Sequence, residues 1–303
     1  MNKRLTRSEY IFSLFFIFML ICALAAFFYG VQIGTQRAEA KHALSVKKPD
    51  QTKVTAYNQQ YLVSFYHTIF SPYREFQNTW FEQIEAIENR HHSAAPASQL
   101  EELEIMAKEQ YSKISRTGMP AASPLLQDAQ TNYLKSLKLF TSAAARLKNS
   151  RDHVVGEALA ERIYADPYVQ EAVNFALQAQ SQFYDSIVKW NVTVDPAFKP
   201  LKHSSGGLKL AEWNKLNLNQ KNAYIAAMLS KEGRFEAFAP QDLTLRIDQM
   251  QSSGNLKRLK LANIGQAASV LIDTGAVRPG DYMKNKNRFY KNERLPLIPL
   301  LTS

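Results

Sequence analysis

Residues 10–31 form a run of 22 residues without a single charged side chain. In a helix that rises about 1.5 Å per residue, about 20 apolar residues cross the hydrocarbon core of a bilayer. Tyr10 and Tyr29 lie near the two ends of the run, where amphipathic rings favour the headgroup region, and Phe16 and Leu20 lie inside it. The segment therefore predicts a transmembrane signal-anchor helix.

The orientation of this helix is predicted from the basic residues that precede it. Lys3, Arg4 and Arg7 lie before the span, and such basic flanks favour the cytoplasmic side of a membrane. We therefore expect a single-pass cell-membrane protein with 1–9 as a cytoplasmic tail and 32–52 as an extracytoplasmic stalk. Basic residues also follow the span, so the reversed orientation stays an alternative, as does cleavage of the segment as a secretory signal.

The single cysteine, Cys22, lies inside this apolar run. No disulfide, thiolate zinc site or cysteine nucleophile can therefore form within the rest of the chain. The remainder has an ordinary globular composition, because the whole chain is 46% hydrophobic and 21% charged.

Between residues 53 and 195, apolar side chains recur at steps of three and four in four separate segments, which is the period of a helix face. Short polar connections join these segments, a pattern typical of an antiparallel four-helix bundle. We therefore predict an all-α protein in which this bundle follows the membrane helix, and we assign the aromatic residues of the stripes to its core.

Local signals predict where these helices begin. Ser123-Pro124 and Asp166-Pro167 each combine a capping residue with a proline at the first helical position. Ser98 to Glu101 has the pattern of a capping box. Ser71-Pro72 falls within the first stripe, where we expect a kink or a restart of the helix.

The glycine content changes near residue 200, with two glycines between residues 35 and 205 and seven between 206 and 280. We therefore predict a linker over 196–208 and a smaller helical domain over 209–282. Its helices are expected at approximately 209–217, 219–231, 240–252 and 257–273. The last segment, 283–303, is expected to be a basic tail.

The net charge of +10 is concentrated in this C-terminal part, since residues 199–303 carry 17 basic and 8 acidic side chains. The densest segment interleaves basic and aromatic residues, a composition that suits contact with an anionic surface. Its candidate binding residues are Lys284, Lys286, Arg288, Phe289, Tyr290, Lys291 and Arg294. The alternative is a solvated tail whose charge only aids solubility.

Two short motifs contain the residue types of known chemical sites. Asp273-Thr274-Gly275 is similar to the active-site triplet of retropepsin-type aspartic proteases, but helical spacing precedes it and too few residues follow. We therefore expect Gly275 to end a helix. Glu88 and His91 have the spacing of a di-metal bundle motif, but the bundle holds no second copy. The sequence thus predicts no catalytic residue, metal or cofactor, and leaves enzymatic activity open.

These observations favour a membrane-anchored extracytoplasmic scaffold or interaction protein of a bacterial envelope, whose basic region contacts anionic lipid, a wall polymer or a protein partner. A ligand-binding or sensor bundle acting with a membrane partner is one alternative. An envelope enzyme with a site in the C-terminal domain is another. Nucleic acid is a candidate partner only in the reversed orientation, and the oligomeric state is not predicted.

Overall fold

A computed structural model describes residues 56–89, 97–150, 154–195, 198–199 and 207–302. The predicted membrane helix and stalk lie outside these residues, as does most of the predicted linker. All regular structure in the described part is helical apart from one isolated bridge, so the all-α prediction is confirmed there. None of the described helices is both long enough and apolar enough to cross a membrane.

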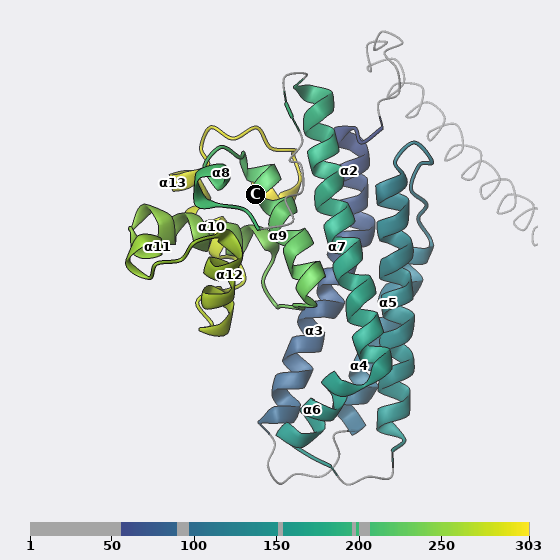
Figure 1. The fold of residues 1–303 in the computed structure, drawn as a ribbon. Helices are drawn as coiled ribbons and strands as arrows, with labels where there is room; N and C mark the ends of the chain where they lie inside the picture. The colour runs from purple at the N-terminus through teal and green to yellow at the C-terminus, as the bar shows by residue number, and fades with distance from the viewer. Residues whose placement is uncertain (1–55, 90–96, 151–153, 196–197, 200–206, 303) are drawn as a thin grey trace, which may run out of the picture. The chain divides into compact units, whose positions relative to one another are not determined.

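The N-terminal part of the described chain is built from long helical segments. They are α2 (Gln59–Phe65) with η1 (Tyr66–Phe70) and α3 (Ser71–Glu88), then α4 (Ala97–Ser115), α5 (Pro124–Lys148), the shorter α6 (Glu157–Ala165) and α7 (Pro167–Val194). Helix α5 packs along both α4 and α7, and α3 packs against α4 and α6 (Figure 1).

Both helices begin at the predicted prolines, α5 at Pro124 after Ser123 and α7 at Pro167 after Asp166. The Ser123 hydroxyl does not cap α5, however, and accepts from the backbone N–H of Tyr57 at 3.2 Å. The Asp166 carboxylate accepts hydrogen bonds from the first free backbone N–H groups of α7, as a helix cap does. Helix α4 already includes Ser98, so that serine lies inside the first turn and does not precede it.

The expected disturbance at Ser71-Pro72 takes the form of a π-helical turn. The Ser71 N–H donates to the carbonyl of Tyr66, five residues back, and both Phe70 and Ser71 keep helical backbone angles. Proline has no N–H to donate, and a wider turn is a common way to absorb such a defect. A restart with Ser71 as a cap is therefore wrong, because the backbone stays helical through this position.

Aromatic rings fill the space between the long helices, as the sequence predicts. Phe183 of α7 lies with its ring centroid 5.0 Å from that of Phe65 and 4.7 Å from that of Phe70. Nearer the other end of α3, the Trp80 ring lies 4.5 Å from that of Phe140 on α5. All five side chains are buried, so they join three long segments in one apolar core.

The C-terminal part consists of shorter helices. They are α8 (Leu210–Trp213), α9 (Leu218–Glu232), α10 (Pro240–Ser252), α11 (Asn255–Arg258), α12 (Ile264–Asp273), α13 (Asp281–Phe289) and α14 (Pro299–Thr302). The predicted helix over 257–273 is broken because Lys260 has a positive φ of 52°, which a helix does not permit. Gly275 follows the end of α12 with a φ of 61°, as expected of a helix stop.

The segment expected as a basic tail is folded against the rest of the chain. It contains most of α13 and all of α14, and Tyr290, Ile298 and Leu301 are buried in the same core as the long helices. Helix α9 also packs against α7. The described residues accordingly belong to one compact unit, Val54–Ser303.

Candidate functional site

The structure places the seven candidate residues on α13 and on the chain that follows it. Lys284, Arg288, Lys291 and Arg294 are exposed, whereas Lys286 and Phe289 are partly buried. Tyr290 is only 7% exposed. The side chain of Tyr290 therefore belongs to the interior and is not available to a partner, in contrast to the expectation from sequence.

Tyr290 is held by the buried carboxylate of Asp248 on α10. Its hydroxyl donates to Oδ2 of Asp248 on α10 at 2.6 Å. Burial, followed by the nearby Asp248 charge, raises the pKa of Tyr290, so the phenol stays protonated and keeps this hydrogen bond. One aspartate within an amphipathic helix gives no signal that could have identified it in advance.

Asp248 has two further partners from helices α8 and α9. Its Oδ1 accepts from Nε1 of Trp213 at 2.6 Å, and Nζ of Lys221 lies 3.0 and 2.9 Å from its two oxygens. The Lys221 and Asp248 side chains are only 13% and 11% exposed. We call Asp248, Lys221, Trp213 and Tyr290 the Asp248 cluster, and it fixes the end of α13 against α8, α9 and α10.

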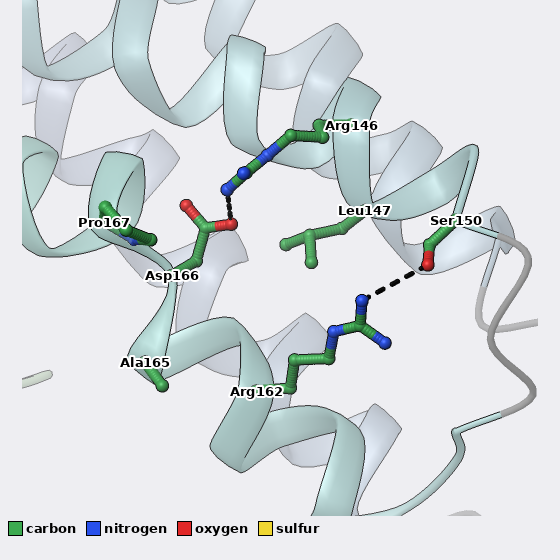
Figure 2. Close-up of a pocket in the computed structure, with 7 residues that line it drawn as sticks. All are labelled: Arg146, Leu147, Ser150, Arg162, Ala165, Asp166 and Pro167. Carbon is green, nitrogen blue, oxygen red and sulfur yellow. Dashed lines mark hydrogen bonds and ion pairs between the residues drawn. The ribbon is translucent and has the colours of Figure 1, made fainter.

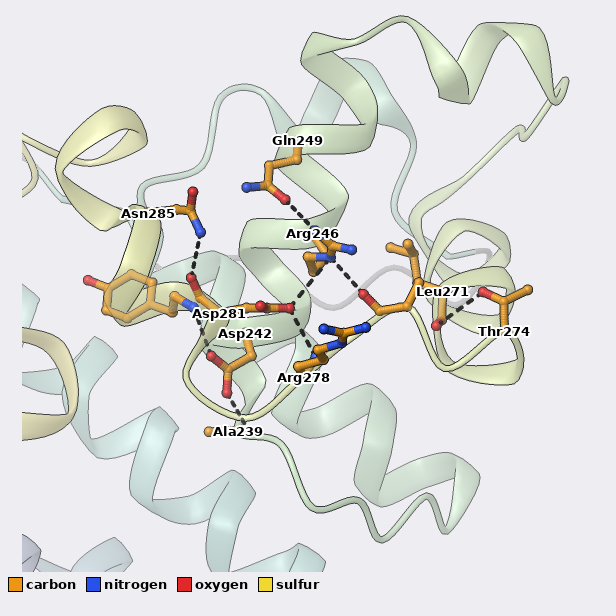
Figure 3. A network of polar contacts seen from close by, with 11 residues as sticks. Ala239, Asp242, Arg246, Gln249, Leu271, Thr274, Arg278, Asp281 and Asn285 are labelled. Atoms are coloured by element: carbon orange, nitrogen blue, oxygen red, sulfur yellow. Dashed lines mark hydrogen bonds and ion pairs between the residues drawn. The ribbon is translucent and has the colours of Figure 1, made fainter.

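A second carboxylate fixes the beginning of α13. Oδ1 of Asp242 accepts from the backbone N–H of Tyr282 at 2.9 Å, while Oδ2 accepts from that of Ala239 at 3.0 Å (Figure 3). The hydroxyl of Tyr282 donates to the carbonyl of Leu301 at 3.0 Å. Burial raises the pKa of Asp242, against the effect of these backbone donors.

Arg246 of α10 lies in the same polar network (Figure 3). Its Nε donates to the carbonyl of Ala276 at 2.7 Å and lies 3.6 Å from Oδ2 of Asp281, and its Nη1 donates to Gln249 at 3.0 Å. The guanidinium is thus held in one position beside α13. Arg246 did not stand out in the sequence, because it lies far along the chain from the predicted basic segment.

The exposed cations on α13 and directly after it have no acidic partner among the described residues, unlike Arg146, Arg234 and Arg246. Within the described part of the chain, Lys284, Arg288 and Lys291 form no ion pair. Arg294 donates to the carbonyl of Val194 on α7 at 2.8 Å, which fastens the loop after α13. Three positive charges therefore face solvent on a segment that is rigidly held at both ends.

A hollow lined by Arg146 and Arg162 lies where α5, α6 and α7 meet (Figure 2). There Arg146 pairs with Asp166, the cap of α7, and Arg162 donates to the hydroxyl of Ser150. The Arg146 guanidinium also lies over the ring of Tyr168. These contacts join three helices, so the charges of this hollow have a structural role.

The structure also shows where residues of the two short sequence motifs lie. Asp273 ends α12 and pairs with Arg234 at 3.0 Å, so this aspartate lies at a helix end and is already held by an arginine. Glu88 ends α3, and His91 lies outside the described residues. Among the described side chains, no three acidic, histidine or cysteine residues are grouped so that they could hold a metal ion.

Comparison with protein-family models, curated proteins and solved structures found no match to this chain.

Glu236, between α9 and α10, should make the stability of the protein depend on pH. Burial raises the pKa of Glu236 above its ordinary value of 4.5, so the ionised side chain opposes folding. As the pH falls through the raised value, the folded state takes up the proton first and gains stability relative to the unfolded state. We expect Glu236→Gln to be more stable than the wild type at neutral pH, and the difference to vanish near about pH 4.

Urea unfolding of both proteins at the two pH values measures this difference. The matched control is Glu109→Gln, which replaces an exposed glutamate on α4. A constant difference between Glu236→Gln and wild type across the pH range would contradict the role assigned to this carboxyl.

Proposed function

We propose that this protein is a single-pass, membrane-anchored interaction protein of a bacterial envelope. In this proposal, residues 10–31 anchor the chain, the long helices form an antiparallel four-helix bundle outside the membrane, and the C-terminal part presents a basic surface. Its partner is an anionic surface of the envelope, in the first place phosphate-bearing lipid headgroups.

The observation that carries the proposal is the set of exposed, unpaired cations Lys284, Arg288 and Lys291 on a fixed segment. Cations without a carboxylate neighbour attract an anionic surface without first losing an internal ion pair. Because α13 is fastened by Asp242 at one end and by Asp248 at the other, the charges keep their spacing. This combination distinguishes the surface from a flexible basic tail.

The test uses the full chain in nanodiscs of neutral phosphatidylcholine, with vesicles immobilised on a sensor surface. Vesicles containing phosphatidylglycerol should bind the protein, and vesicles of phosphatidylcholine alone should not. The variant Lys284→Gln/Arg288→Gln/Lys291→Gln should weaken binding by about tenfold or more, because each neutralised cation near an anionic bilayer removes about 1 kcal/mol. Added salt should weaken wild-type binding.

The matched control Arg116→Gln/Lys135→Gln/Lys138→Gln removes the same charge from exposed positions, one directly after α4 and two on α5. If both triple variants lose vesicle binding equally, binding depends only on net charge, and the proposal is contradicted. Reporter fusions after residues 9, 60 and 303 test the topology, since a cytoplasmic C-terminus would rule out an envelope partner.

A further inference from the structure

A groove beside α13 has the features of a specific ligand site. It is a cavity of about 400 Å³ between α10, α11, α12 and α13. This volume lies within the range of small-molecule pockets, which run from about 300 to 1,000 Å³. The groove is formed by residues that are far apart in the sequence, and only Arg288 and Phe289 among them belong to the predicted basic segment.

The polar wall of the groove carries two guanidinium groups. Arg246 is fixed by its hydrogen bond to the Ala276 carbonyl and by its contact with Gln249. Arg288 is exposed, its guanidinium lies 5.5 Å from the centroid of the Phe289 ring, and its side chain has no hydrogen bond to a described residue. Guanidinium groups bind phosphate and carboxylate oxygens through paired donors, so the wall suits an oxyanion.

Two serines at the end of α10 also line the groove. The hydroxyls of Ser252 and Ser253 each donate to a backbone carbonyl three residues back, so the charged donors of the wall are the two guanidinium groups. The carboxylate of Asp281 lies 3.6 Å from Nε of Arg246, one of the lining residues. Two cations against one carboxylate leave a net positive charge at the site.

The floor of the groove is apolar. It is formed by Met250 and Leu271, both buried, and by the partly buried ring of Phe289. An inorganic ion alone would leave this floor uncovered. A ligand that joins an oxyanion to a small apolar group would satisfy both the wall and the floor.

We propose that this groove binds a phosphoryl group that carries an apolar substituent. The ligand is either the headgroup region of an anionic lipid or a free organic phosphate, and the two share the same recognition chemistry. This inference rests on the proposed function only in the lipid case. Exposed Lys257 and Arg258 on α11 and Lys284 on α13 lie on the elements around the groove and favour the approach of an anion.

The experiment is calorimetric titration of the full chain in a non-ionic detergent. The probes are phenyl phosphate, dihexanoyl phosphatidic acid, dihexanoyl phosphatidylcholine and inorganic phosphate. We expect saturable binding of phenyl phosphate, of phosphatidic acid, or of both, and weaker binding of inorganic phosphate. Preference for phosphatidic acid over phenyl phosphate indicates a lipid source, and the opposite order indicates a free organic phosphate.

Two variants locate the binding. Arg288→Gln should raise the dissociation constant by about tenfold or more, because it removes a charge-assisted hydrogen bond. Ser252→Glu should abolish binding, because it places a carboxylate beside the phosphoryl group. The matched control Arg116→Gln should leave the constant within about twofold, because its charge lies in the turn after α4 and does not line the groove.

Absence of saturable binding by the wild type, or equal effects of Arg288→Gln and Arg116→Gln, would overturn the inference. Vesicle binding by the same preparation is measured in parallel. If vesicles bind but phenyl phosphate and phosphatidic acid do not, the proposed function stands on surface charge and the groove has no part in it. If the two short ligands bind but vesicles do not, the groove is a small-molecule site and the proposed function fails.

Discussion

Asp248→Ala is expected to lower the free energy of unfolding by about 3–5 kcal/mol, the range seen when one partner of a buried ion pair is removed. The substitution leaves the Lys221 ammonium, only 13% exposed, without its carboxylate. It also leaves the Trp213 Nε1–H and the Tyr290 hydroxyl without their acceptor. Urea denaturation followed by circular dichroism measures the change.

The matched control is Asp273→Ala, which also removes an aspartate paired with a basic residue. Asp273 lies 3.0 Å from Arg234, but its side chain is 55% exposed. Exposed ion pairs contribute at most about 1 kcal/mol, so this variant should remain close to the wild type in stability. If Asp248→Ala is no more destabilised than Asp273→Ala, the Asp248 cluster does not hold the C-terminal part together.

The helix starts were predictable because they depend on local chemistry. A proline fixes its own φ and lacks only an N–H that the first turn does not use, so Pro124 and Pro167 mark real beginnings. At Ser71-Pro72 the same reasoning allowed a kink or a restart, and Ser71 does not act as a cap because the backbone before it is already helical. There, long-range packing of Phe65 and Phe70 against Phe183 keeps the helix continuous, and a π-turn absorbs the missing donor.

The site could be predicted only in part. The charge excess pointed to α13, and Arg288 and Phe289 do line the groove there. No sequence pattern connects them to Arg246 or to the serines at the end of α10, because only the tertiary fold brings these elements together. Tyr290 lies in a segment whose composition suits a surface contact. Its hydroxyl bonds to Asp248 in the interior, and Asp248 becomes its neighbour only in the folded chain.

Deletion of residues 282–303 is expected to destabilise the protein strongly. Burial of one large apolar side chain contributes about 1.5–3 kcal/mol, and the deletion removes Tyr290, Ile298 and Leu301 from the core. These three alone amount to about 5–9 kcal/mol, comparable with the whole stability of a typical domain. The truncated chain should therefore lose its cooperative thermal transition and become sensitive to limited proteolysis.

The triple variant Lys284→Gln/Arg288→Gln/Lys291→Gln is the control that separates binding from folding. It removes three charges from exposed side chains and leaves every buried contact of the segment in place. Exposed substitutions usually change stability by no more than about 0.5 kcal/mol, so its thermal transition should match that of the wild type. If the truncated chain also unfolds like the wild type, the segment contributes little to the core. In that case, loss of vesicle binding by the truncated chain can be assigned to the missing segment. If the truncated chain unfolds, only the triple variant tests the role of the three charges in binding.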